Sequence, residues 1–293
     1  MVLLVFDEGP GIGLGHRRRC LALADALAAI GIDSHAAPLG DDDPEELLRL
    51  TTMHAADALV VDSYRVRADA RETPIPVIAV DDLQRDLDVD LVIDPNPGAS
   101  SSSRAARVLC GPAYALMARA PVSPTPITKN VEAILVTFGA SDPDGRAVRI
   151  ANDLAHRHPS ACVSVAIGPW AERAPSPDPG VECITASDGL LRELAASDLV
   201  VTAGGVTMLE SLSLGRPTVV VPTAENQYRA VHGVAAADAA VVLAIGASDN
   251  EIVATTDHLV ADADRRRQLA TAGPSYIDGN GATRAAEVIH ALI

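Results

Sequence analysis

The sequence predicts an α/β protein with two domains, each built on its own parallel sheet. Short runs rich in valine, isoleucine and leucine alternate with longer segments whose apolar residues recur at helical spacing. A stretch with three prolines, ARAPVSPTPITKN, separates two such series and is typical of a linker. The length of 293 residues also fits two domains. We expect a first domain over 1–120, a linker over 121–131 and a second domain over 132–293, whose last helix can pack back toward the first.

Each element of the first half follows from a local pattern. VLLVF, ALVVD and LVIDP are apolar runs of strand length, and CLALADALAAI has helical spacing. The predicted strands are 2–6, 33–37, 58–62, 76–80, 91–95 and 108–110, with helices over 17–29 and 43–51.

The second half repeats the alternation. AILVTF, DLVVT and PTVVVP are its clearest strand-like runs, and LESLSLGRP ends a helix with glycine and then proline. The predicted strands are 133–138, 161–167, 181–185, 198–202, 217–222 and 240–244. The predicted helices are 143–156, 188–196, 206–214, 225–238, 248–260, 263–272 and 281–293.

Composition restricts the classes of function. The net charge of −16 disfavours binding to nucleic acid or to an anionic membrane. The four cysteines form no close C-x-x-C pair, so no metal site or redox motif is indicated, and we predict no cofactor. No apolar run reaches the roughly 18 residues of a membrane helix, and no signal peptide is recognisable, so we expect a cytoplasmic protein.

The stretch GIGLGHRRRC places glycines, a histidine and three arginines where the first strand gives way to a helix. Gly13 and Gly15 allow the backbone to approach a ligand closely. Arginines on a first helical turn oppose the helix dipole, so an anion should lie nearby. A dinucleotide-binding turn is the alternative, but His16 occupies the third glycine position of G-x-G-x-x-G. We therefore disfavour the dinucleotide-binding turn and expect Arg17 to contact an anionic substrate.

Two further strand-to-helix turns carry glycine in the second half. In TFGASDPDG, Gly139, Ser141 and Asp142 precede a helix and could hold a phosphate, although this turn taken alone favours a plain capped helix.

The third turn, TAGGVTMLE, offers a second helix N-terminus. Gly204, Gly205, Val206 and Thr207 open it, and Glu210 could bind a ribose or simply be a solvated carboxylate. Open parallel sheets bind ligands beyond the carboxyl ends of their strands. The three turns together predict a nucleotide-sugar in a cleft between the two domains.

These stretches resemble a known family. GIGLGHRRRCLALADAL, AGGVTMLESLSLGRPTVVVPTAENQ and IDGNGATR are similar to the UDP-sugar hydrolases of the pseudaminic acid pathway, which act on a UDP-linked diacetamido-trideoxy altrose. The resemblance covers the whole chain. It implies two Rossmann-like domains in the GT-B glycosyltransferase architecture, and a UDP-sugar as substrate.

The resemblance also implies roles for individual residues. His16 matches the base that activates water, and Tyr64 matches an active-site tyrosine. Glu210 matches a ribose-binding glutamate, and Asn226 and Gln227 match residues near the sugar and phosphates. The glycines and hydroxyls of TFGASDP and AGGVT match the nucleotide-binding loops.

Four motifs of the first half differ from the family pattern. D-H-Y reads D-S-Y, so Ser63 replaces a histidine, and a Q-N pair reads Pro95-Asn96. The opening V-F-D-E-G and the run M-A-R-A-P also differ. We place Ser63 and Asn96 among the substrate-binding residues and expect a sugar other than the altrose derivative, or a small-molecule acceptor in place of water.

Other interpretations are compatible with the same residues. A GT-B glycosyltransferase would use the same donor site, and a non-catalytic sugar-nucleotide binding protein is the least favoured interpretation. Asp81 and Asp82, after the run PVIAV, could equally support the site or cap a loop.

Overall fold

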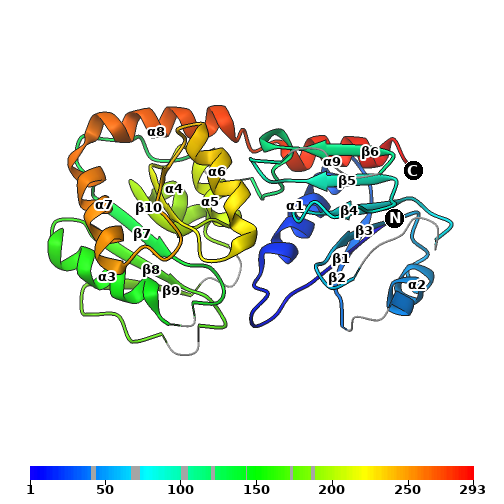
Figure 1. Cartoon of the computed structure of the whole chain (residues 1–293), viewed down its shortest axis with the longest axis horizontal. Helices are drawn as coiled ribbons and strands as arrows, with labels where there is room; N and C mark the ends of the chain where they lie inside the picture. The colour runs from blue at the N-terminus through cyan, green and yellow to red at the C-terminus, as the bar shows by residue number, and fades with distance from the viewer. Residues whose placement is uncertain are drawn as a thin grey trace. The chain divides into compact units, whose positions relative to one another are not determined.

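The computed structural model describes residues 1–40, 44–66, 73–99, 105–119, 123–142, 144–171, 174–185 and 189–293. Its chain divides into two compact units. Unit 1 comprises Met1–Ala118 together with Gly279–Ile293, and unit 2 comprises Arg119–Asp278. Each unit is built on one six-stranded parallel sheet with helices packed against it (Figure 1). The chain is therefore an α/β protein with two Rossmann-like units, as the sequence predicts.

The sheet of unit 1 has the strand order β2-β1-β3-β4-β5-β6. All its pairings are parallel, and Phe6 is in register with Asp62 where β1 and β3 end. Residues that follow the central strands consequently gather at one edge of the sheet. The strands are β1 (Val2–Phe6), β2 (Ser34–Pro38), β3 (Ala58–Asp62), β4 (Val77–Val80), β5 (Leu91–Asp94) and β6 (Arg107–Cys110).

Helices cover both faces of this sheet. Leu4 packs in one apolar cluster with Leu23 and Ile289, whereas its neighbour Leu3 packs in another with Leu47. Because both faces are buried, the central strands are nearly continuous apolar runs. The helices of unit 1 are α1 (Gly15–Ala29), α2 (Pro44–Met53), the short 3-10 helix η2 (Pro112–Tyr114) and α9 (Gly281–His290).

The sheet of unit 2 has the order β12-β11-β10-β7-β8-β9. Val136 packs with Val148 and Ile252 on one face, and Leu135 packs with Leu194 on the other. Its strands are β7 (Ala133–Thr137), β8 (Cys162–Ile167), β9 (Val181–Thr185), β10 (Leu199–Ala203), β11 (Thr218–Val221) and β12 (Val241–Val242). Its helices are α3 (Arg146–Arg157), α4 (Leu191–Ala196), α5 (Val206–Ser213), the 3-10 helix η3 (Glu225–Gln227), α6 (Tyr228–Ala236), α7 (Asp249–Ala261) and α8 (Ala263–Tyr276).

The segment before β7 is attached to unit 2. The backbone N–H of Thr125 donates to the carbonyl of Ala195 at 2.9 Å, and buried Arg216 donates to the carbonyl of Thr125 at 2.7 Å. Of the predicted linker 121–131, the first two residues lie outside the described residues. The remainder is part of unit 2 by its contacts.

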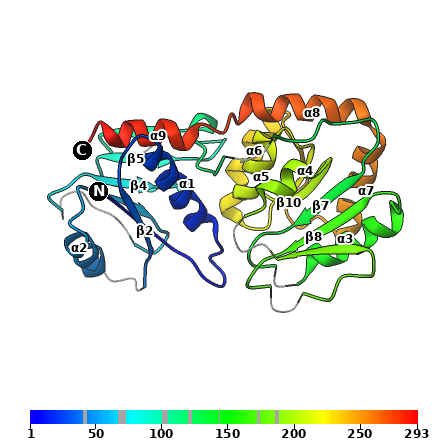
Figure 2. The ribbon, with the colours of Figure 1, turned by 180° about the vertical axis from the view of Figure 1, so that it is seen from behind.

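The last helix belongs to unit 1. α9 packs along α1, where Ala285 and Ile289 are fully buried beside Leu23 (Figure 2). The predicted second domain, 132–293, therefore differs from unit 2, which ends at Asp278.

The predicted helix 143–156 begins later in the structure, because Gly145 has a left-handed backbone with a φ of 62°. α3 starts directly after it at Arg146, while Pro143 lies outside the described residues. Asp142 accepts hydrogen bonds from the backbone N–H of Arg146 at 3.0 Å and of Ala147 at 2.8 Å, which satisfies N–H groups of the first turn. The predicted helix 225–238 is η3 followed by α6.

Close packing requires glycine at the start of α9. A Cβ at Gly281 would overlap the backbone of Ala115, whereas a Cβ at Gly15, the first residue of α1, would meet no atom within 4 Å. We expect Gly281→Ala to lower the free energy of unfolding by about 1–3 kcal/mol through overpacking. The matched variant Gly15→Ala should stay within about 0.5 kcal/mol. Denaturant unfolding measures both, and equal effects would contradict this account.

Candidate active site

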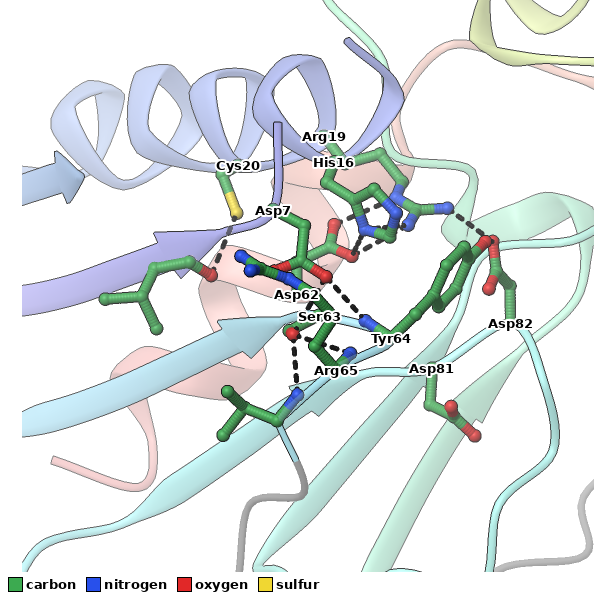
Figure 3. A network of polar contacts seen from close by, with 12 residues as sticks. Asp7, His16, Arg19, Cys20, Asp62, Ser63, Tyr64, Arg65, Asp81 and Asp82 are labelled. Carbon is green, nitrogen blue, oxygen red and sulfur yellow. Dashed lines mark hydrogen bonds and ion pairs between the residues drawn. The ribbon is translucent and has the colours of Figure 1, made fainter. Parts of the chain in front are cut away.

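A row of aspartates lies at the carboxyl edge of the unit 1 sheet. Asp62 and Asp94 end β3 and β5, Asp7 follows β1, and Asp81 and Asp82 follow β4. All are less than 7% exposed. Because the strands are parallel neighbours, their ends meet at one edge, and Figure 3 shows most of these carboxylates with their partners.

The glycine turn places His16 above this edge. Gly13 has a positive φ of 89°, and its N–H donates to the carbonyl of Gly9 at 2.9 Å. This tight turn lets α1 begin at Gly15, so His16 lies on its first turn. The imidazole is only 3% exposed.

His16 pairs with a buried carboxylate. Its Nδ1 lies 2.6 Å from Oδ1 of Asp62, which is fully buried. An ionised carboxylate only accepts hydrogen bonds, so Nδ1 carries the proton and Nε2 carries the lone pair. An imidazole oriented in this way by a carboxylate can accept a proton at Nε2.

The contacts of Arg19 show why an arginine occurs at the start of α1. Its Nε and Nη2 donate to the two oxygens of Asp62 at 2.9 and 2.7 Å, and its Nη1 donates to Asp82 at 2.6 Å. Burial lowers the pKa of Arg19, but the two carboxylates outweigh it and raise that pKa well above its ordinary value. The anions expected near the helix are thus side chains of the protein itself.

Arg17, two residues before Arg19, lies at the surface. Arg17, predicted to contact substrate, has a side chain that is 44% exposed and pairs with Glu8 at 3.7 Å. Its neighbour Arg19 instead forms the buried bridge. An arginine three residues after a histidine lies on the same helix face, and this spacing distinguishes the two arginines.

Tyr64 touches both parts of the network. Its hydroxyl donates to Asp82 at 2.9 Å, and its ring meets the ring of His16 edge-on at a centroid distance of 4.4 Å. Burial raises the pKa of Asp82, but Arg19 and Tyr64 more than offset burial and lower it. His16 and Tyr64, both predicted to be catalytic, therefore lie side by side.

The hydroxyl of Ser63 forms hydrogen bonds that hold the loop carrying Tyr64. Its hydroxyl donates to Asp7 at 2.9 Å and accepts from the backbone N–H of Arg65 and Val66. The side chain of Arg65 holds the other oxygen of Asp7 at 2.9–3.0 Å. Ser63 is 1% exposed, so in this structure its hydroxyl contacts the loop and not solvent.

The remaining polar residues of this edge also make internal bonds. Asn96, predicted to contact substrate, donates from its side chain to the carbonyl of Asp82 at 3.4 Å. Asp81 binds Arg85 at 2.6 Å, and Arg85 donates to the carbonyl of Ser63. Of the two adjacent aspartates, Asp82 supports His16 and Tyr64, while Asp81 fixes a loop.

Sequence reasoning missed Asp62 and Asp7. The signal was present: an aspartate lies at or directly after the end of four of the strands, which are neighbours in the sheet. In a parallel sheet, that pattern alone places the carboxylates together.

In unit 2, three loops follow the adjacent strands β7, β10 and β11. Gly139 has a positive φ of 86°, and Ser141 has a buried hydroxyl oxygen with no hydrogen-bond partner among the described residues. Asp142 accepts from the first N–H groups of α3, although the N-cap residue of this helix is Gly145.

Gln227 joins the other two loops. Its side-chain oxygen accepts from the N–H of Gly204 at 3.1 Å and of Thr223 at 2.9 Å. A Cβ at Gly204 would collide with Val231, so glycine is required there, while Gly205 faces open space. Asn226 lies beside Gln227 in η3.

The helix after Gly205 carries the other predicted nucleotide residues. Val206 is the first residue of α5, followed by Thr207, and Glu210 lies one turn further on. Glu210 is 3% exposed, so it is not a solvated surface carboxylate.

Two kinds of feature are missing from the part of the chain that the structure describes. No helix there is both long and apolar enough to cross a bilayer. No group of three or more histidine, cysteine, aspartate or glutamate side chains is arranged to hold a metal ion. In the aspartate row, Arg19, Arg65 and Arg85 form ion pairs with four of the five carboxylates.

The Asp7–Arg65 pair predicts sensitivity to acid. Burial raises the pKa of Asp7, but hydrogen bonds from Arg65, Ser63 and Tyr64 reverse that effect and lower it. A carboxyl with a lowered folded-state pKa stabilises the fold above its unfolded pKa, and this contribution disappears as pH falls below about 4.

We expect Arg65→Gln to cost about 1–3 kcal/mol at neutral pH, because a buried carboxylate loses its charged partner. Because the folded-state pKa of Asp7 is then no longer lowered as far, the loss of stability as pH falls below about 4 should also become smaller than in the parent. Arg265→Gln is the control, since its partner Asp238 is 70% exposed in their ion pair. Urea unfolding across pH measures both variants, and indistinguishable acid limbs would contradict the prediction.

No protein-family model and no curated protein matches the sequence. Solved structures do match across the whole chain. A spinosyn rhamnosyltransferase complexed with thymidine diphosphate is 18% identical, with a TM-score of 0.66 and 100% of both chains covered. MurG of Acinetobacter baumannii is 14% identical, with a TM-score of 0.62 and 99% of both chains covered. S. aureus MnaA, in a structure with UDP, is 15% identical, with a TM-score of 0.65, covering 100% of this chain and 97% of that one. The chain has the two-domain α/β fold of the GT-B glycosyltransferases.

Proposed function

We propose that this protein is a nucleotide-sugar enzyme that hydrolyses a UDP-linked sugar, with His16 as the general base. The observation that carries the proposal is the 2.6 Å contact between His16 Nδ1 and buried Asp62. That contact leaves Nε2 as the proton acceptor, on a sheet edge where α/β folds bind their ligands.

The reaction follows from this arrangement. Nε2 of His16 takes a proton from water while the water oxygen bonds to the anomeric carbon of the sugar. The bond from that carbon to the phosphate oxygen breaks, and UDP leaves with the electron pair. Tyr64, packed against the imidazole edge-on, restricts the ring orientation. Proximity and proton transfer together account for the catalysis that this unit supplies.

The nucleotide is assigned to unit 2. Gly205 opens an eight-residue helix whose first N–H groups and dipole favour a phosphate. Gly139, Ser141 and Thr207 flank the same sheet edge, with Glu210 proposed for the ribose. Two of the similar structures support a nucleoside diphosphate, since one contains thymidine diphosphate and the other UDP. The choice of UDP rests on the sequence resemblance.

Glycosyl transfer is the second candidate. A specific observation favours it: a spinosyn rhamnosyltransferase complexed with spinosyn aglycone matches 99% of this chain with a TM-score of 0.64. In that case His16 would take its proton from an acceptor hydroxyl in place of water. A sugar other than the altrose derivative, or such an acceptor, rests on the departures from the family pattern alone, since Ser63 and Asn96 make internal hydrogen bonds.

Turnover of a panel of UDP-sugars tests the function. We expect UDP release without any acceptor, and free sugar as the second product. Formation of a conjugate, together with faster UDP release when small hydroxyl acceptors are added, would identify a transferase. No UDP release from any sugar, with or without acceptor, would refute both candidates and leave a binding protein.

The proposed role of His16 predicts that its replacement lowers turnover but does not change UDP binding. We expect His16→Asn to lower kcat by about 10²–10⁴-fold, the usual contribution of a general base, and to leave UDP affinity unchanged. Steady-state kinetics and calorimetry measure the two quantities. Near-normal turnover in a folded variant would remove His16 from this role.

The proposed role of Glu210 in binding the ribose predicts that its replacement lowers UDP affinity. We expect Glu210→Gln to weaken UDP binding about 10-fold or more, because a charge-assisted hydrogen bond to ribose is lost. Glu287→Gln, on the exposed face of α9, is the control and should bind UDP as the parent does. Calorimetry with UDP decides, and equal affinities in all three proteins would contradict the assignment.

A further inference from the structure

His16 and four neighbouring side chains form a closed circuit of contacts (Figure 3). His16 bonds to Asp62, Asp62 to Arg19, and Arg19 to Asp82. Asp82 accepts from the hydroxyl of Tyr64, whose ring returns to His16. The circuit joins α1 to the ends of β3 and β4, and Arg19 is its only cation that is permanently charged.

Arg19 fixes the orientation of the carboxylate that His16 uses. Its Nε and Nη2 grip both oxygens of Asp62, the two-pronged geometry that only arginine supplies. Held in this way, the carboxylate cannot rotate without breaking two charge-assisted hydrogen bonds. Its Oδ1 therefore stays directed at Nδ1 of His16.

The same guanidinium also lies close to the imidazole of His16. Nη2 of Arg19 lies 3.0 Å from Nδ1 of His16 and 2.7 Å from Oδ1 of Asp62. An N–H that donated to Nδ1 would stabilise the opposite tautomer, with its proton on Nε2. The charged oxygen is the closer and stronger acceptor, so the Arg19 proton goes to Asp62 and Nδ1 keeps its own.

We propose that Arg19 is a positioning residue that selects the Nδ1–H tautomer of His16 by clamping Asp62, with Asp82 holding the guanidinium in place. This inference rests on the proposed role of His16 as base, and it adds a residue that acts only through another. Arg19 is 8% exposed and contacts Asp62, Asp82 and His16.

Arg19→Met is the decisive variant, with two readouts. Nitrogen NMR shifts of labelled His16, without any substrate, should change from one Nδ1–H form to a mixture of forms. The kcat for UDP-sugar cleavage should fall about 10–100-fold. A loss of this size is usual when a residue that orients a reacting group, but does not itself contact substrate, is replaced. KM should stay within about twofold, and added guanidinium ion should restore part of kcat.

Two further variants keep the test decisive. Arg107→Met, on the exposed edge strand β6, should leave both readouts at the parent values. If Arg19→Met does not fold, Arg19→Met with Asp82→Asn removes one buried charge of each sign, and the same shift in His16 signals is expected.

The outcomes separate this inference from the proposed function. A folded variant that keeps a single Nδ1–H signal and parent kcat overturns the role of Arg19. If the parent cleaves no nucleotide-sugar, the proposed function fails, but the NMR signals of His16 still decide whether Arg19 selects the tautomer. A large rise in KM at constant kcat would mean that Arg19 binds substrate, which also overturns the inference.

Discussion

The guanidinium of Arg19 lies between two buried carboxylates, one ending β3 and one following β4. Burying a charge is costly unless it is paired and fully hydrogen-bonded. Here two carboxylates and one imidazole share a cation that donates to both carboxylates, so each charge has a partner. The position of His16, the orientation of Asp62 and the hydroxyl of Tyr64 all depend on that pairing. The rest of the edge repeats the principle with Arg65 on Asp7 and Arg85 on Asp81.

Local sequence patterns were sufficient for most of the fold. The strands of both sheets fall within one or two residues of their apolar runs, because buried parallel strands need continuous branched side chains. Helix starts were less accurate. α3 begins only after Gly145, whose left-handed backbone is not evident from the local spacing, and Asp142 then accepts from the N–H groups of Arg146 and Ala147.

The site was partly predictable. His16 and Tyr64 could be named from the resemblance. Asp62, the partner of His16, is 46 positions further along the chain, and the β1–β3 pairing brings the two together. Ser63 illustrates the converse problem. A substitution relative to a family suggests altered contact with substrate, yet the hydroxyl donates to Asp7 and accepts from the N–H of Val66. Sequence comparison identifies a position, whereas the hydrogen bonds identify what the side chain contacts.

The return of α9 to unit 1 imposes an order on folding during synthesis. All six strands of the unit 1 sheet emerge from the ribosome before any of unit 2, but Ala285 and Ile289 emerge after all of it. Domains generally fold as units, with the N-terminal one first. Unit 1 cannot follow that rule, because part of the apolar face that includes Leu4 awaits a helix not yet made. The continuous unit 2 can complete its core first, and the nascent sheet must stay soluble with one face partly uncovered until α9 has been synthesised.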